Sequence, residues 1–164
     1  MKPNVADPNG RGAMKEELTK AVVNYLDTHR HCTLATIRED SSPQASTVSY
    51  VSDGLKIYFM TDPSSQKAKN MAFWPKVALA ISEDFLDWDE IKAVQLAGTV
   101  EWLEAGPELS RAQKMFARKF PQVKKYLDSW SVTIEQIPFL RVSPTIINYL
   151  DYSKGFNHWD TIEL

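Results

Sequence analysis

The sequence has few of the residues and segments that mark several common classes of protein. It has a single cysteine, Cys32, so it cannot form an intrachain disulfide, and this fits a reducing compartment. Its 19 basic and 21 acidic residues leave a formal net charge of -2, which gives no support for a nucleic-acid or membrane partner. No apolar run reaches the length of a membrane span, and residues 1–12 contain no hydrophobic signal region. We therefore expect a cytoplasmic protein.

Sequence motifs for several types of site are also missing. There is no Gly-x-Gly-x-x-Gly dinucleotide turn, no Walker-type phosphate loop and no Gly-x-Ser-x-Gly nucleophile elbow. His29, His31 and Cys32 are close in the sequence, but no partnering Cys or His accompanies them. They follow a predicted helix, whose C-terminal dipole favours a cationic histidine. We therefore interpret His29 and His31 as capping residues and predict no metal site.

The pattern of apolar residues predicts one domain at 13–164, preceded by a flexible tail at 1–12 that is rich in Pro and Gly. Helical periodicity or capping signals predict four helices, at 13–30, 66–73, 108–120 and 123–130. Strands are predicted at 33–38, 44–51, 55–60, 76–82, 92–103, 137–142 and 145–150. The mostly hairpin order of these six or seven strands indicates an α+β domain, mainly β, built on a barrel or strongly coiled sheet.

Three segments carry more specific expectations. The strand at 76–82 is apolar on both faces, which predicts a central and buried strand. The strand at 92–103 is the longest expected, and Gly98 inside it indicates a bulge or a close approach. The acidic, aromatic segment at 83–91 is interpreted as a lid or surface loop, and 151–164 as a tail without a strand.

The chain is organised around the end of the strand at 55–60, where an alternating strand leads into a helix. The Asp-Pro pair at 62–63 ends the strand, and Ser64 or Ser65 is placed to cap the following helix. Thr61 lies at the end of the strand and Lys67 in the first helical turn. Hydroxyls, free N–H groups and an ammonium together suit an anion such as a phosphate. The alternative is ordinary capping with a solvated Lys67.

A set of short motifs, ordered along the chain, carries a family resemblance. They are Thr33-Leu34-Ala35-Thr36, Pro43-Gln44-Ala45-Ser46-Thr47-Val48, Ile57-Tyr58-Phe59-Met60-Thr61, Ser65-Gln66-Lys67-Ala68-Lys69-Asn70, Pro75-Lys76-Val77-Ala78-Leu79 and Val94-Gln95-Leu96-Ala97-Gly98-Thr99-Val100-Glu101. In this order the chain resembles the pyridoxamine 5'-phosphate oxidase-like flavoproteins, the FMN-binding split-barrel family. The resemblance implies a split barrel that forms a homodimer, with FMN between the two subunits.

The resemblance also implies positions for the cofactor. The residues expected to face the flavin ring, through backbone and side chain, are Ala45, Ser46, Thr47 and Val48, with Met60 and Thr61 continuing the wall. Ser64, Ser65 and Lys67 lie at the phosphate end, and Gln95 would reach the flavin, either of its own chain or of the partner subunit. Lys154 and Trp159 belong to an aromatic C-terminal tail that either closes the flavin site or packs on its own barrel.

The sequence departs from the oxidase itself at several of these positions. The oxidase typically has Arg where this chain has Ala45 and Gln66, and its C-terminal Arg and His have no counterpart here. We therefore do not expect pyridoxamine 5'-phosphate oxidase activity. The leading expectation is an FMN-dependent oxidoreductase that transfers hydride or electrons to a small molecule, with no catalytic residue assigned. The alternatives are a non-enzymatic carrier of flavin or haem and a deazaflavin-dependent reductase.

Overall fold

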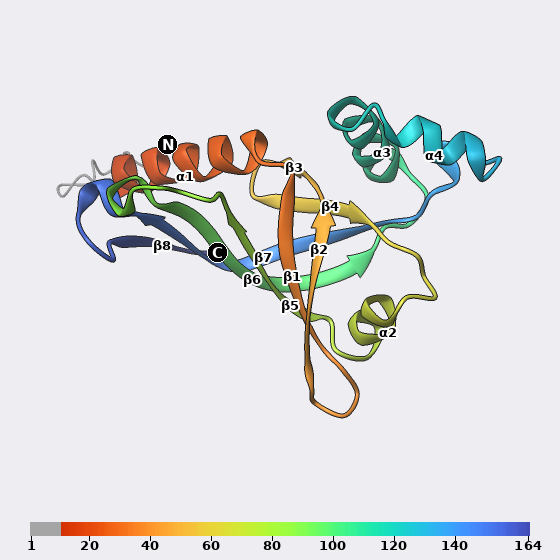
Figure 1. Ribbon diagram of the computed structural model, residues 1–164, viewed down its shortest axis with the longest axis horizontal. Helices are drawn as coiled ribbons and strands as arrows, with labels where there is room; N and C mark the ends of the chain where they lie inside the picture. Colours follow the sequence, from red (N-terminus) through yellow and green to blue (C-terminus); the bar gives the residue numbers. More distant parts are fainter. Residues whose placement is uncertain (1–10) are drawn as a thin grey trace, which may run out of the picture.

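The computed structural model describes residues 11–164, in which one curled antiparallel sheet is flanked by helices (Figure 1). Its strands are β1 His31–Ile37, β2 Pro43–Ser49, β3 Val51–Asp53, β4 Lys56–Met60, β5 Lys76–Ser82, β6 Lys92–Trp102, β7 Phe139–Asp151 and β8 Trp159–Glu163. Their order is β2-β1-β5-β6-β7-β4-β3, and β8 pairs with the second half of β7. The predicted fold class, a mainly β split barrel with flanking helices, is confirmed.

The four predicted helices are present, and each of their ends lies within two residues of the predicted one. They are α1 Arg11–Thr28, α2 Gln66–Phe73, α3 Pro107–Lys119 and α4 Val123–Ser129, with 3-10 turns η1 Trp88–Glu90, η2 Ile134–Gln136 and η3 Tyr152–Lys154. Most of the predicted tail lies outside the described residues, and its last two residues begin α1. None of the helices in 11–164 is long and apolar enough to cross a bilayer.

Two hydrophobic cores lie on opposite faces of β4. The larger core fills the curl of the sheet beneath α1, where Leu26 is fully buried and its carbonyl accepts a hydrogen bond from Tyr50 Oη at 2.8 Å. The smaller core lies under α3 and α4 and contains Tyr58 and Phe116. The alternation predicted for 55–60 is confirmed, since Ile57 and Phe59 face the larger core and Tyr58 faces the smaller one. Because both faces of β4 are covered, its central residues, 57–59, are all buried.

The last strands differ from the prediction. The two segments predicted at 137–142 and 145–150 form the single strand β7, which has 13 residues and is longer than β6. The register between β6 and β7 shifts at Gly98, where a Cβ would lie 2.3 Å from the Ser143 carbonyl oxygen. The expected close approach at this glycine is confirmed. The C-terminal segment also contains β8, which the sequence analysis missed, and Ile162 of β8 is buried in the larger core.

Strand β5 has the predicted bounds and a central place in the sheet, but it is buried on one face only. Its burial alternates, so that Val77, Leu79 and Ile81 are buried while Ala78 and Ala80 are exposed. The prediction of a fully buried strand is therefore wrong for this chain. Alanine is apolar enough to be counted as core in a sequence pattern, but nothing in the described chain covers this side of the sheet.

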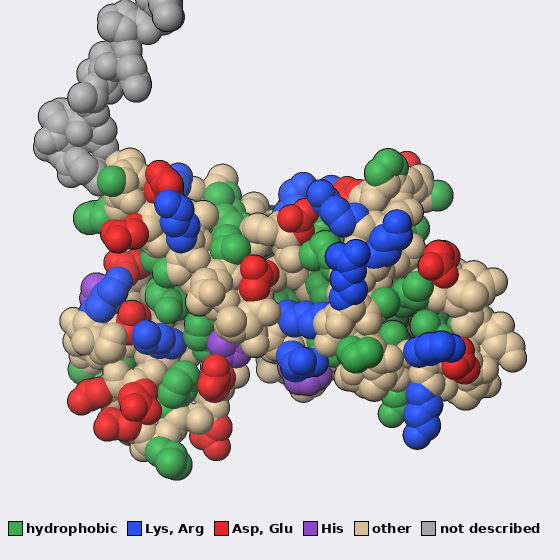
Figure 2. Space-filling model, turned by 90° about the horizontal axis from the view of Figure 1, so that it is seen from above, with side chains coloured by type: hydrophobic (Ala, Val, Ile, Leu, Met, Phe, Trp, Pro, Cys, Tyr) green, Lys and Arg blue, Asp and Glu red, His purple; other side chains and the backbone are tan. Residues whose placement is uncertain are grey.

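Charge is distributed unevenly over the molecule although its net charge is small. Figure 2 shows Lys and Arg side chains gathered around α3 and α4, and Asp and Glu side chains at the opposite end of the molecule. The exposed acidic residues of the β5–β6 loop are Glu83, Asp84, Asp87, Asp89 and Glu90. In the same loop Trp88 stacks on Phe156 with ring centroids 5.8 Å apart, and both rings are exposed.

Candidate functional site

The segment between β4 and α2 holds the hydroxyls predicted for an anion site. Ser65 is the N-cap of α2, and its Oγ accepts a hydrogen bond from the Ala68 N–H at 3.4 Å. The Thr61 Oγ1 lies 3.3 Å from the same Oγ. Ser64 instead donates its N–H and hydroxyl to Asp62 Oδ1, both at 2.8 Å. Of the two candidate capping serines, Ser65 caps the helix and Ser64 closes the turn.

The charges at the start of α2 favour an anion. Its first turn contains no acidic residue, and the N–H groups of that turn have no partner within the helix. Lys67 is half-buried in this turn, and its ammonium forms no hydrogen bond or ion pair with another residue of 11–164. The pKa of Asp62 is lowered by hydrogen bonds from Ser64, with the charge of Lys67 adding to the effect. An ammonium and free N–H groups therefore lie beside two hydroxyls.

Strand β2, predicted to face the flavin ring, is the edge strand of the sheet and is hydrogen bonded to β1 alone. Its residues alternate between the two faces: Ala45 and Thr47 are exposed, Ser46 is half-buried and Val48 is buried. The four side chains therefore do not line one surface. What they share is the backbone of an edge strand, whose outward N–H and C=O groups are free to bind a planar ligand.

A buried asparagine links this edge strand to the helix. Asn70 of α2 is 1% exposed, and its Nδ2 donates to Gln44 Oε1 and to Thr36 Oγ1, each at 2.9 Å. Its Oδ1 accepts from Gln66 Nε2 at 2.8 Å. Gln66 itself is exposed at the surface, and this hydrogen bond ties its amide to Asn70.

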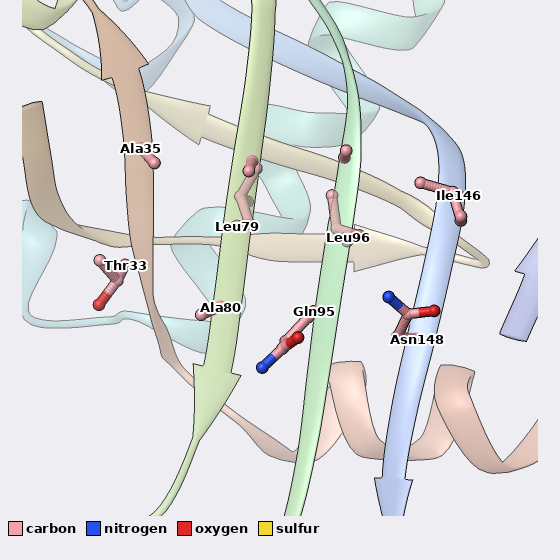
Figure 3. A pocket seen from close by; sticks show the side chains of 10 residues that line it. Thr33, Ala35, Leu79, Ala80, Gln95, Leu96, Ile146 and Asn148 are labelled. Atoms are coloured by element: carbon pink, nitrogen blue, oxygen red, sulfur yellow. The ribbon is translucent and has the colours of Figure 1, made fainter. Parts of the chain in front are cut away.

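Gln95 lies in another part of the molecule, on the exposed face of the sheet (Figure 3). Figure 3 shows its side chain between Ala80 of β5 and Asn148 of β7, in a hollow of about 320 Å³. Between Gln95 and β2 lie strands β1 and β5. Three strand spacings amount to about 14 Å, so one chain does not bring Gln95 to the β2 edge.

The exposed face around Gln95 is built of small and uncharged side chains. Directly paired residues in an antiparallel sheet share a face, so two rows cross six strands. The rows are Thr47, Thr33, Ala80, Gln95, Asn148, Thr161 and Ala45, Ala35, Ala78, Ala97, Ile146, Glu163. Their only charged member is Glu163, on the strand at the end of each row.

The C-terminal residues predicted to reach the cofactor are exposed at the end of the molecule opposite α3 and α4 (Figure 1). Trp159 is 55% exposed in β8, and Lys154 Nζ lies 2.9 Å from Asp160 Oδ2. The hydrogen bond from Lys154 lowers the pKa of Asp160. The tail packs on its own barrel through β8 and Ile162, whereas the rings of Trp159 and Phe156 stay exposed.

The three residues considered for a metal point in different directions. His29 Nδ1 lies 2.6 Å from the Tyr25 carbonyl oxygen near the end of α1, which agrees with its predicted capping role. His31 is in β1, on the exposed face of the sheet, so its predicted role as a helix cap is wrong. Cys32 is buried on the other face, and burial raises the pKa of its thiol to about 12.

Comparison with known proteins supports the fold and identifies the family. A family model described as pyridoxamine 5'-phosphate oxidase matches residues 18–141. Because this match covers most of the chain, the protein belongs to the pyridoxamine 5'-phosphate oxidase family. No curated protein matches the sequence significantly.

Several solved structures are similar to the chain. The conserved hypothetical protein Rv2991 from Mycobacterium tuberculosis has a TM-score of 0.69 and 24% identity, covering 82% of this chain and 85% of that one. General Stress Protein 26 from Bacillus anthracis has a TM-score of 0.68 and 18% identity over 90% and 99% of the two chains. A heme binding protein from Mycobacterium smegmatis has a TM-score of 0.70 and 21% identity, over 99% of this chain and 59% of that one. These likenesses show the fold alone.

Sequence reasoning missed two features of the site. The hydrogen bonds of Asn70 were not foreseen, because a polar residue in a short helix carries no sign of its partners. The uncharged sheet face was missed because Ala78 and Ala80 were assigned to the core. Small residues at every second position of two strands (Thr33 and Ala35, Ala78 and Ala80) would have been the available signal.

Proposed function

We propose that the protein binds FMN, with the phosphate at the start of α2 and the flavin ring along the edge of β2. The observation that carries this proposal is the meeting of Thr61, Ser65 and Lys67 at a helix N-terminus that is tied to β2 through Asn70. Family membership supports the same location. The function we infer is oxidoreduction of a small molecule, because a bound flavin supplies hydride and electron transfer.

The residues at the start of α2 fit a phosphate group. The Lys67 ammonium provides charge, the hydroxyls of Thr61 and Ser65 can donate, and the first-turn N–H groups of α2 have no helical acceptor. These neutral donors stand in for the arginine that the oxidase has at the position of Gln66, whose amide here is engaged with Asn70. The protein therefore holds the anion with one lysine and neutral donors.

The edge of β2 fits a planar ring that carries hydrogen-bonding groups. Its free backbone groups can pair with the polar edge of the isoalloxazine, while half-buried Met60 at the end of β4 supplies an apolar contact. The two small side chains on its exposed face, Ala45 and Thr47, leave room for the ring. No side chain here is assigned as a general acid or base.

A second copy of the chain is the proposed cover of the exposed sheet face. Small apolar side chains from four strands form a continuous strip on this face (Ala45, Ala35, Ala78, Ala97), and an exposed apolar patch indicates an interaction site. The candidate site is also incomplete in one chain, because Gln95, Lys154 and Trp159 lie away from β2 and α2. Two copies packed through this face form a homodimer in which those residues approach the partner's β2 edge.

Haem is the second candidate ligand. His31 lies on the same exposed face as Thr33, and its Nδ1 lies 3.1 Å from the Ser49 hydroxyl. This contact leaves Nε2 available as an iron ligand at the β2 edge. The similar Mycobacterium smegmatis protein is described as heme binding. The non-enzymatic alternative is a protein that carries haem or flavin and catalyses no reaction.

Ligand-dependent melting tests the proposal. A ligand that binds only the folded state adds about 2.7 kcal/mol at 100 times its Kd, which is about 5–10 °C in Tm for a chain of this size. We expect this shift with FMN, together with a flavin absorption band that survives gel filtration. A shift with haemin alone, abolished in His31→Ala, would favour haem, and no shift with either would refute both. Oxidation of a reduced nicotinamide nucleotide across a panel of acceptors then separates an enzyme from a carrier.

A further inference from the structure

The buried side-chain amide of Asn70 is fully hydrogen bonded beneath α2. It is 1% exposed, and each side of its amide is bonded: Nδ2 donates to two acceptors and Oδ1 accepts one hydrogen bond. Thr36, one of the acceptors, is itself 2% exposed. An amide presents donors and an acceptor at fixed positions, so no apolar or carboxylate side chain can make the same set of bonds.

The partners of Asn70 belong to the two ends of the proposed site. Gln66, which donates to Asn70, lies in the first turn of α2 between Ser65 and Lys67. On the other side Gln44, which accepts from Asn70, is the second residue of β2, and its Nε2 lies 3.4 Å from Ser46 Oγ. A continuous chain of side-chain bonds therefore runs from the phosphate end to the ring end.

Both ends are also held to β1, β2 through its ladder and α2 through buried Met71, but few contacts join the two ends directly. Strand β2 is paired on one side only, and α2 is a helix of eight residues between two loops. Among residues 11–164 the bond from Asn70 to Gln44 is the one hydrogen bond between α2 and β2. This amide is thus the direct link that fixes α2 against the edge strand, in addition to the packing of each on β1.

We propose that Asn70 is a positioning residue that sets the distance between the phosphate end and the ring end, so that one ligand engages both. The proposal rests on the proposed function. Binding energy from the phosphate is gained in full only if the ring and phosphate contacts are made together. Asn70 therefore determines how strongly the protein prefers FMN over riboflavin, which lacks the phosphate.

The test compares FMN and riboflavin affinities in variants of the full chain. Asn70→Leu removes every bond of the amide, and Gln44→Met removes the β2 partner from a half-buried position that is less critical for folding. Gln113→Leu is the control: Gln113 is 3% exposed and donates to the Glu135 and Ile137 carbonyls, far along the chain from either end of the site. All three variants lose bonds, but only the first two break the Asn70 chain.

We expect the ratio of FMN to riboflavin affinity to fall by about tenfold in Asn70→Leu and in Gln44→Met, and to stay unchanged in Gln113→Leu. A purely structural role would lower Tm in both the Asn70 and the Gln113 variant and leave the ratio unchanged, which would overturn the proposal. If Asn70→Leu does not fold, the Gln44→Met ratio decides alone.

A double-mutant cycle with Lys67→Ala gives a second readout. It measures the coupling of the two substitutions in FMN affinity, which a loss of stability alone would not produce. If Asn70 positions the phosphate end, Lys67→Ala should weaken FMN binding about 10- to 100-fold in the wild type and at most about threefold in Gln44→Met. Additive losses would overturn the positioning role while leaving FMN binding intact. A wild-type protein that binds neither flavin would instead overturn the proposed function, and the positioning role with it.

Discussion

The charge of Lys67 provides the sharpest test of where the phosphate lies. Within 11–164 its ammonium has no hydrogen-bonded or ion-paired partner, and it lies in the first turn of α2 beside the hydroxyls of Thr61 and Ser65. Replacing it with alanine therefore removes a cation without breaking a bond of the folded protein. We expect Lys67→Ala to leave Tm of the ligand-free protein nearly unchanged.

The magnitude follows from the type of contact. A charge-assisted hydrogen bond contributes about 1.5–3 kcal/mol, which corresponds to roughly 10- to 100-fold in Kd. The Lys67 ammonium also interacts electrostatically with the nearby Asp62 carboxylate, and this interaction contributes to the lowered pKa of Asp62. Since that carboxylate is exposed and bonded to Ser64, we expect the loss to fall within the stated range.

The assay is fluorescence titration of FMN and riboflavin at low and high salt. Lys67→Ala should weaken FMN binding and leave riboflavin binding unchanged, and added salt should reduce the difference between the two proteins. Lys69→Ala is the matched control, because Lys69 is on the same helix but lines the groove with Trp102 and Pro138. Equal losses for both flavins, or an equal effect of Lys69→Ala, would refute the assignment of the phosphate to this helix end.

Three further predictions concern the fold and assembly. Gly98→Ala places a Cβ 2.3 Å from the Ser143 carbonyl oxygen and should cost about 1–3 kcal/mol, or roughly 2–12 °C in Tm. Gly106→Ala, whose Cβ meets no atom within 4 Å, should change Tm little, and equal melting of the two variants would show that the β6–β7 backbone adjusts freely. The pKa of Glu108 is lowered mainly by its hydrogen bond from Arg141 and further by the one from Tyr58. The ionised Glu108 therefore stabilises the folded protein at pH values above its unfolded pKa of about 4.3. This stabilisation is lost as the pH falls through the lower pKa of the folded state. The stability difference between wild type and Glu108→Gln, measured by urea unfolding, should therefore be larger at pH 6 than at pH 3, and a constant difference would contradict this role. Ala80→Arg, in the middle of the exposed sheet face, should convert a dimer to a monomer in light scattering, whereas Ala105→Arg in an exposed turn should not; a wild-type monomer would refute the dimer.

Local sequence patterns were sufficient for the elements that depend on local signals. The capping serine before α2 is fixed by its backbone conformation and by the hydrogen bond from the Ala68 N–H. For the same reason α2 and β5 have the predicted bounds. The hydroxyls and the lysine of the candidate phosphate end follow from this local geometry, since they lie within seven residues of one another.

Contacts between distant segments could not be predicted in this way. Strand β8 is held by its ladder with β7 and by burial of Ile162, and neither leaves a signal in a short polar segment. The burial of Tyr58 depends on α3, which lies about fifty residues away and covers the outer face of β4. Which face of a strand is covered is a property of the packing and not of the strand.

The antiparallel, mainly β class, the positions of the helices and the chemistry at the start of α2 could be predicted from the sequence, because each depends on residues close together in the chain. Three features became visible only in the folded molecule: β2 is an edge strand, Asn70 joins it to α2, and Ala78 and Ala80 lie on an uncovered face. These features depend on strand order and on burial in three dimensions. An alanine in an apolar run looks the same in the sequence whether it packs against a core side chain or lies on an uncovered face.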